Sequence, residues 1–188
     1  MITDYANGFI RTFDNILTEE ENAIIGNELS YLQFVFGETD ESDTPPSGLV
    51  SELSNDHFTK NILLDYINNN NLVPNTFCDR AYVNLYAPNE RTFFHHDFTE
   101  YTALYYPGPS WNINAGGETK FFFTENKFDS IIQENSEQFP IMISIAPIPN
   151  RLVVFKGDIL HSATSFIDVH RYSVAFKFLR NENEEKIL

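Results

Sequence analysis

The feature that most constrains the fold of this 188-residue chain is a series of short apolar segments in its second half. From Asp79 onward, stretches rich in β-branched and aromatic side chains alternate with turn residues, a pattern typical of an all-β sandwich or barrel. We predict eight strands, over 80–86, 92–98, 101–106, 118–124, 141–146, 151–156, 158–163 and 171–179. Short strands at this spacing favour a distorted jelly roll, or double-stranded β-helix, which protects strand edges by packing two sheets together.

The first part of the chain has a different periodicity, which predicts helices. In 14–34, Thr18 and Glu21 have the spacing of a capping box, and apolar residues follow at helical intervals. A second helical stretch, 58–67, leads into an asparagine-rich run. The acidic, proline-containing segment 37–48 between them is predicted to be a loop.

The predicted fold class is therefore mainly β with N-terminal α-helices. We expect one domain over residues 1–188, because this length suits a single core. Neither the loop 37–48 nor the asparagine-rich run is long enough to separate two domains. In this domain, residues 1–78 form a helical support region and residues 79–180 form the jelly-roll core.

The charge restricts which partners the protein can bind, and the cysteine content indicates the compartment that suits it. Asp and Glu number 27 against 12 Lys and Arg, and the formal charge of -15 repels nucleic acid and anionic membranes. No apolar run approaches the roughly 18 residues of a membrane span, and residues 1–15 lack a signal-peptide pattern. The single cysteine, Cys78, fits a reducing compartment. We expect a soluble, cytoplasmic protein with no nucleic acid or membrane partner, and the sequence predicts no particular oligomeric state.

The segment FFHHDFTEYTALYY, residues 93–106, places two histidines and an aspartate in an aromatic, β-branched stretch. Burying imidazole and carboxylate groups costs free energy unless they are paired or bind a ligand. On a strand, residues i and i+2 share a face, so His95 and Asp97 would point the same way while His96 points away. A His-x-Asp pair alone is a weak indication of a site.

A second group of candidate residues lies downstream, where His161 ends a predicted strand and Arg171 opens the next. Two imidazoles and one carboxylate are the ligand set of non-haem Fe(II) oxygenases, and they leave three coordination positions open. A 2-oxo acid can chelate at two positions, and dioxygen can take the third. Arg171, alternating inward with Ser173, would then hold the far carboxylate of the co-substrate, because a buried arginine is costly without an anion.

The order of these residues resembles the Fe(II)/2-oxoglutarate-dependent dioxygenases, most closely their prolyl 4-hydroxylase-like branch. The resemblance covers roughly 79–179 and is carried by LYAPNERTFFHHD, TALYYPGPSW, GGETKFF, APIPNRLVVFKGDILHSA and RYSVAFKF. It implies that His95, Asp97 and His161 bind iron and that Arg171 binds the C5 carboxylate of 2-oxoglutarate. The carboxylate at Asp97 separates the chain from the halogenase variant, which has a glycine there.

The same resemblance implies further contacts and cofactors. Tyr86 and Tyr106 match positions that hydrogen-bond the co-substrate, with a packing role as the alternative for each. Ser173 matches an R-x-S pattern found in part of the superfamily. Dioxygen is implied as the second co-substrate and ascorbate as a reductant, in a reaction that converts 2-oxoglutarate to succinate and CO2.

Three functions are consistent with these residues. The leading expectation is hydroxylation of a prolyl or similar side chain in a peptide or protein. The second is hydroxylation of a free amino acid or another small molecule. The third is a jelly-roll domain that binds metal without catalysis, and Arg171 argues against it because a structural metal site has no use for an inward arginine.

Overall fold

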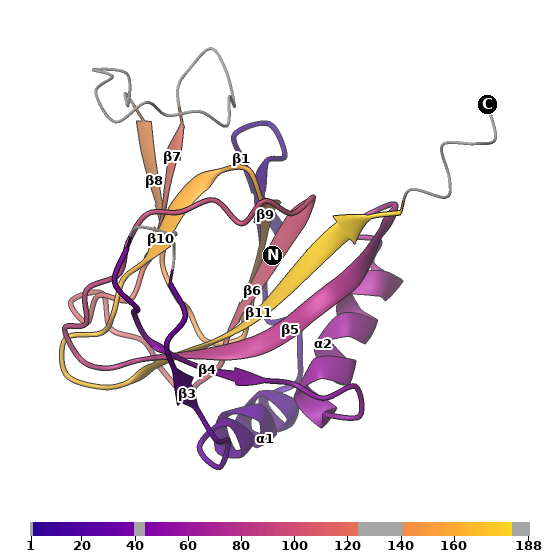
Figure 1. The fold of residues 1–188 in the computed structure, drawn as a ribbon. Coiled ribbons are helices and arrows are strands. Elements are labelled where there is room, and N and C mark those ends of the chain that lie inside the picture. The colour runs from indigo at the N-terminus through magenta and orange to yellow at the C-terminus, as the bar shows by residue number, and fades with distance from the viewer. Residues whose placement is uncertain (1, 40–43, 124–140, 182–188) are drawn as a thin grey trace, which may run out of the picture.

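The computed structural model describes residues 2–39, 44–123 and 141–181, which form two β-sheets and two helices (Figure 1). The elements are β1 (Ile2–Tyr5), β2 (Ile10–Asp14), α1 (Glu19–Leu29), β3 (Val35–Phe36), β4 (Leu49–Glu52), α2 (Phe58–Asn69), β5 (Thr76–Tyr86), β6 (Tyr101–Tyr106), β7 (Thr119–Phe123), β8 (Ile141–Ile145), β9 (Arg151–Lys156), β10 (Leu160–Ala163) and β11 (Arg171–Arg180). The larger sheet has the order β1-β2-β9-β6-β11-β5-β4-β3, and the smaller has the order β10-β7-β8. Neighbouring strands pair antiparallel, and the arrangement confirms the predicted jelly roll.

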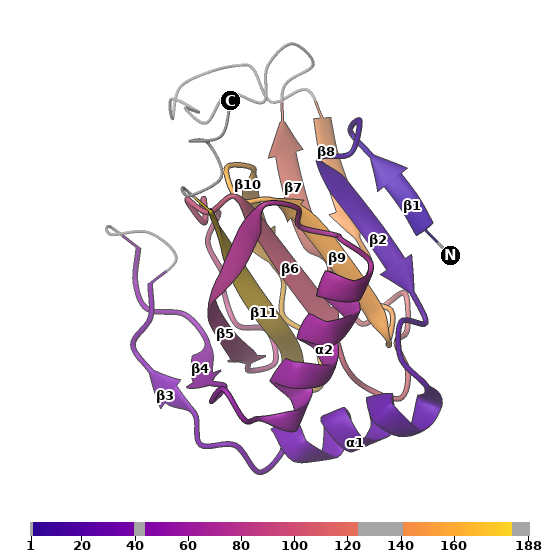
Figure 2. The same ribbon diagram turned by 90° about the vertical axis from the view of Figure 1, so that its right-hand side faces the viewer.

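Both helices pack on the outer face of the larger sheet (Figure 2). Thr18 caps α1 in the predicted capping box: its hydroxyl accepts from the backbone N–H of Glu21, and the Glu21 carboxylate accepts from the N–H of Thr18. Leu63 and Ile67 of α2 are buried against sheet residues such as Phe176. Neither helix in the described ranges has the length and apolar character needed to cross a membrane.

Side chains of the central strand β11 alternate between two cores. Val174 and Phe176 belong to the core under the helices, whereas Ala175 belongs to the core between the two sheets. Because side chains on a strand alternate between faces, Arg171 and Ser173 share the inner face with Ala175. The candidate co-substrate residues therefore point between the sheets.

The predicted strand over 92–98 is wrong. Within this segment only His95 forms a β-bridge, to His161, and Phe98 has a positive φ of 54°. Isolated contacts replace a ladder: the Asp97 N–H donates to the Gly157 carbonyl at 2.8 Å. The aromatic composition that suggested a strand thus accompanies an irregular segment that carries two candidate ligands.

The described part of residues 1–78, predicted as a helical support region, contains the two expected helices, four complete strands, β1 to β4, and the start of β5. β1 and β2 form a hairpin whose connecting turn has positive φ at Ala6, Asn7 and Gly8. β3 and β4 extend the larger sheet beyond β5. These strands have two to five residues, which is too short for an alternation to stand out in the sequence.

Candidate metal centre

His95, Asp97 and His161 come together although they lie on different parts of the chain. His161 is on β10, and the other two precede β6. The backbones of His95 and His161 pair directly, with N–H to carbonyl distances of 2.9 Å and 3.0 Å. One possible ligand atom from each of the three side chains lies within 4.8 Å of the others.

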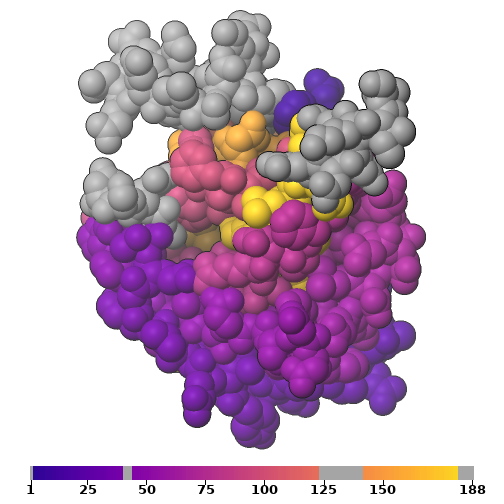
Figure 3. All heavy atoms as spheres, turned by 45° about the vertical axis from the view of Figure 1, so that its right-hand side comes forward, coloured from indigo at the N-terminus to yellow at the C-terminus, as the bar shows by residue number. Residues whose placement is uncertain are grey.

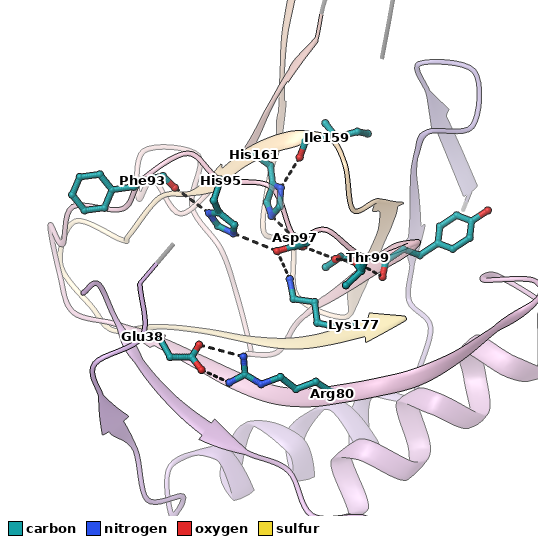
Figure 4. Close-up of polar contacts among 11 residues, drawn as sticks. Glu38, Arg80, Phe93, His95, Asp97, Thr99, Ile159, His161 and Lys177 are labelled. Carbon is teal, nitrogen blue, oxygen red and sulfur yellow. Dashed lines mark hydrogen bonds and ion pairs between the residues drawn. The ribbon is translucent and has the colours of Figure 1, made fainter. Parts of the chain in front are cut away.

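Each imidazole is oriented by the backbone two residues before it (Figure 4). His95 Nδ1 lies 3.2 Å from the Phe93 carbonyl, and His161 Nδ1 lies 2.8 Å from the Ile159 carbonyl. A carbonyl oxygen can only accept, so Nδ1 carries the proton in both rings and Nε2 presents a lone pair. Both Nε2 atoms face Asp97, each 3.5 Å from one carboxylate oxygen.

The protonation states in this cluster suit a divalent cation, which needs neutral imidazole and ionised carboxylate. Burial lowers the pKa of His161 to about 3, so this ring is neutral near pH 7. Burial opposes ionisation of Asp97, but interactions with His161, Lys177 and His95 hold the pKa of Asp97 well below its usual value. The Asp97 carboxylate also accepts from the Thr102 hydroxyl and contacts the Lys177 ammonium.

Arg171 is buried, with 1% of its surface exposed, and contacts neutral acceptors. Its Nε donates to the Gly117 carbonyl at 2.9 Å, and its two terminal nitrogens donate to the hydroxyls of Ser173 and Thr119, both at 3.3 Å. Within the described parts of the chain, no carboxylate forms an ion pair with it. A buried guanidinium of this kind is costly unless an anion binds beside it.

The two tyrosines named from the sequence both lie beside Arg171. The guanidinium carbon is 5.5 Å from the ring centre of Tyr106 and 5.8 Å from that of Tyr86. The Tyr106 hydroxyl is 2.7 Å from the Thr119 hydroxyl, and burial raises the pKa of Tyr106, so the phenol stays protonated. Tyr105 packs in the core under the helices, so Tyr106 is the member of the pair that faces the candidate site.

A cavity of about 310 Å³ joins the two groups of residues. Its wall includes the three candidate ligands together with Ser173 and Thr119 from the surroundings of Arg171. Figure 3, the space-filling view, shows atoms of the C-terminal strand β11 (yellow) at the surface, between atoms of earlier segments of the chain (magenta and orange). Other residues on the wall include Glu38, Arg80, Tyr82, Tyr86, His96, Leu104 and Lys177.

Sequence reasoning missed two residues of the site. Thr119, in the GGET motif near the start of the predicted strand 118–124, contacts both Arg171 and Tyr106. Lys177 is six residues after Arg171 and therefore shares its face of β11. The alternation of side chains along β11 was the sequence signal that could have identified Lys177.

Comparison with known proteins shows a likeness in fold but none in sequence. No family model matches the chain, and no curated protein matches it. A prolyl 4-hydroxylase from Pseudomonas putida is similar over 92% of this chain and 92% of its own, with a TM-score of 0.63 and 15% identity. A prolyl hydroxylase from Trichoplax adhaerens, in complex with a hypoxia inducible factor oxygen degradation domain peptide fragment, is similar over 96% of this chain and 88% of its own, with a TM-score of 0.63 and 15% identity.

A third similar structure is HygX from Streptomyces hygroscopicus, with nickel, 2-oxoglutarate and hygromycin B bound. It covers 93% of this chain and 84% of its own, with a TM-score of 0.70 and 12% identity. At these identities the comparison establishes the fold, which is that of the 2-oxoglutarate/Fe(II) oxygenases.

Proposed function

We propose that this chain, which has the fold of the 2-oxoglutarate/Fe(II) oxygenases, is an Fe(II)/2-oxoglutarate-dependent dioxygenase that hydroxylates a prolyl or similar side chain in a peptide or protein. The observation that carries the proposal is one cavity bordered both by His95, Asp97 and His161 and by the residues that hold buried Arg171. A metal site without catalysis would need only His95, Asp97 and His161. The second group has the charge required by a dicarboxylic co-substrate.

The candidate ligands fit Fe(II) in type, and His161 and Asp97 fit it in protonation state as well. Two imidazoles and one carboxylate form the facial triad of non-haem Fe(II) oxygenases. When bound, iron would supply the redox chemistry that couples decarboxylation of 2-oxoglutarate, by dioxygen, to oxidation of a C–H bond. Ascorbate is proposed as the reductant that keeps the metal in its Fe(II) form.

The protein's own contribution on the co-substrate side is a preformed anion site. Arg171 would bind the C5 carboxylate of 2-oxoglutarate, and its position is fixed by the Gly117 carbonyl and by the hydroxyls of Ser173 and Thr119. Tyr106 reaches the same place through Thr119. Since these contacts are already in place, little reorganisation is needed when the co-substrate binds.

Around His161 the protein excludes water. The ring centre of Phe155 lies 4.7 Å from that of His161, and Phe121 stacks at 6.0 Å. Both phenylalanines are buried. This apolar surround limits solvent access to the reacting atoms, which protects the substrate reaction from side reactions with water.

Two of the similar structures are prolyl hydroxylases, one of them with a peptide bound, and this supports a prolyl side chain as the target. A second candidate is a polar small molecule. It is favoured by the charged residues Glu38, Arg80 and Lys177 on the cavity wall, an unusual lining for a pocket that receives only a proline ring. HygX, with hygromycin B bound, is an example of a similar fold with a small polar molecule.

The proposal is tested by anaerobic titration of the protein with Fe(II) and 2-oxoglutarate while the weak visible charge-transfer band of the chelate is followed. We expect the band in wild type and its loss in His161→Ala. His170→Ala is the matched control, because His170 is exposed and outside the three-residue cluster, and it should retain the band. Wild-type protein that binds metal but gives no band at any 2-oxoglutarate concentration would exclude the dioxygenase function.

A further inference from the structure

Lys177 introduces a positive charge that the proposed reaction does not use. It lies on the inner face of β11 and borders the cavity, and only 13% of its side chain is exposed. Figure 4 shows the side chain rising from β11 toward Asp97, on the side opposite the two imidazoles. Its ammonium contacts Asp97 Oδ1, and Asp97 is its only carboxylate partner within the described residues.

This ion pair involves a carboxylate that the proposed function assigns to the metal. A divalent ion bound by Asp97 would neutralise the carboxylate and repel a cation held against it. The Lys177 ammonium would then lose the only carboxylate partner that it has within the described residues. A buried, unpaired ammonium is costly, so the loaded site needs another anion near Lys177.

Besides Asp97, the carboxylates on the cavity wall are Glu38, which a second cation already binds, and Asp79, which is exposed to solvent. Arg80 donates from Nε to Glu52 at 2.9 Å and also forms an ion pair with Glu38 (Figure 4). The 2-oxoglutarate carboxylate is also accounted for, since Arg171 would bind it. Arg171 and Lys177 share the inner face of β11 and lie six residues apart.

From these observations we propose that Lys177 is a specificity-determining residue whose ammonium, in the metal-loaded protein, binds a carboxylate group of the substrate. The inference rests on the proposed function and deepens it by naming the substrate class. The substrate carries a carboxylate close to the carbon that is oxidised. The ring of Tyr82, 5.9 Å from the Lys177 ammonium, forms part of the same wall and would pack against the apolar part of that molecule.

Two sources of such a carboxylate are chemically equivalent at this position. One is the free carboxylate of an amino or imino acid, and the other is an acidic side chain next to the target residue in a peptide. Each source has a neutral isostere in which an amide replaces the carboxylate. L-proline and L-prolinamide form the first matched pair, and the blocked dipeptides acetyl-Pro-Asp-amide and acetyl-Pro-Asn-amide form the second.

The test is ligand-observed NMR on full-length protein loaded with Zn(II) and 2-oxoglutarate, so that binding is measured without turnover. We expect at least one carboxylate probe to bind wild type about tenfold more tightly than its amide. Lys177→Arg should keep this preference, whereas Lys177→Met should reduce it to within about twofold. Thermal unfolding of each variant verifies that it is folded.

Equal binding of acid and amide by wild type, a preference that survives in Lys177→Met, or no binding of either carboxylate at millimolar concentration would overturn the inference. Calorimetric titration of 2-oxoglutarate into the same Zn(II)-loaded samples separates this failure from that of the proposed function. If wild type binds 2-oxoglutarate but shows no preference for a carboxylate probe, only the role of Lys177 is wrong. If wild type binds no 2-oxoglutarate, the proposed function itself is wrong.

Discussion

The inner face of β11 carries two cations, buried Arg171 at one end and partly buried Lys177 toward the other, and the two cations are held differently. Arg171 is fixed by three neutral acceptors, one a backbone carbonyl, none of which is a candidate metal ligand. Lys177 is held by the Asp97 carboxylate, which is also a candidate ligand. On the proposed function, the Arg171 end can accept an anion without rearrangement, whereas the Lys177 end would have to change its partner when metal binds.

This difference shows that position on a strand does not by itself decide what a charged residue does. The side chains of Arg171 and Lys177 lie on the same face of β11, near the same cavity, and carry the same charge. Their partners separate them: neutral groups leave the charge of Arg171 available to a ligand, while a carboxylate neutralises that of Lys177 until a metal competes for it.

The largest expected effect concerns the Arg171 end. Arg171→Met should raise the Kd for 2-oxoglutarate of the Zn(II)-loaded protein about a hundredfold, because it removes a charge-assisted bidentate contact. Affinity for Zn(II) in the absence of 2-oxoglutarate should stay within about twofold of wild type, since Arg171 contacts none of the three candidate ligands. Calorimetry measures both quantities, and an unchanged Kd for 2-oxoglutarate would show that the arginine is structural.

A smaller effect of opposite sign is expected at the other end. Lys177→Met should lower the Kd for Zn(II) about tenfold in the absence of 2-oxoglutarate, because the metal no longer competes with an ammonium for Asp97. Competition against a chromophoric chelator measures this change, with Lys177→Arg as the charge-retaining control. Weaker Zn(II) binding in Lys177→Met would mean that the lysine orients the carboxylate for the metal, and the contrast between the two ends would disappear.

The smallest effect refines the account of the Arg171 end. Thr119→Val removes one acceptor from Arg171 and the partner of the Tyr106 hydroxyl, and it should raise the Kd for 2-oxoglutarate about fivefold. Thr12→Val is a matched control, because Thr12 is also buried and its hydroxyl makes no hydrogen bond within the described residues. If both variants bind 2-oxoglutarate equally well, the hydroxyl of Thr119 does not help to fix Arg171.

The sequence predicted the clustering of the candidate site better than the local structure around it. His95, Asp97 and His161 do converge, and Arg171 and Ser173 do share an inner face. The strand proposed for 92–98, however, is an irregular segment joined to β10 at a single bridge. The convergence was predictable because two imidazoles and one carboxylate match the ligand set of the dioxygenases that the sequence resembles, whereas hydrogen bonding of this segment depends on distant backbone that a local pattern does not reveal.

What the sequence did not reveal depends on contacts between distant segments. Lys177 contacts Asp97, which lies 80 residues earlier in the sequence. Thr119 belongs to the candidate site because it contacts the guanidinium of Arg171, which is on β11. β1 to β4 were missed for another reason: each is too short for its periodicity to be read, and pairing with neighbouring strands defines it.

The orientation of the two imidazoles has a consequence for how this protein can change over time. Each ring is positioned by the carbonyl two residues before it, within its own short peptide, and this contact involves none of the other loops of the cavity. Substitutions in those loops can therefore accumulate without misaligning the metal-facing nitrogens. If the cluster is the proposed reaction centre, such short-range support would let a lineage explore new substrates while that centre is kept.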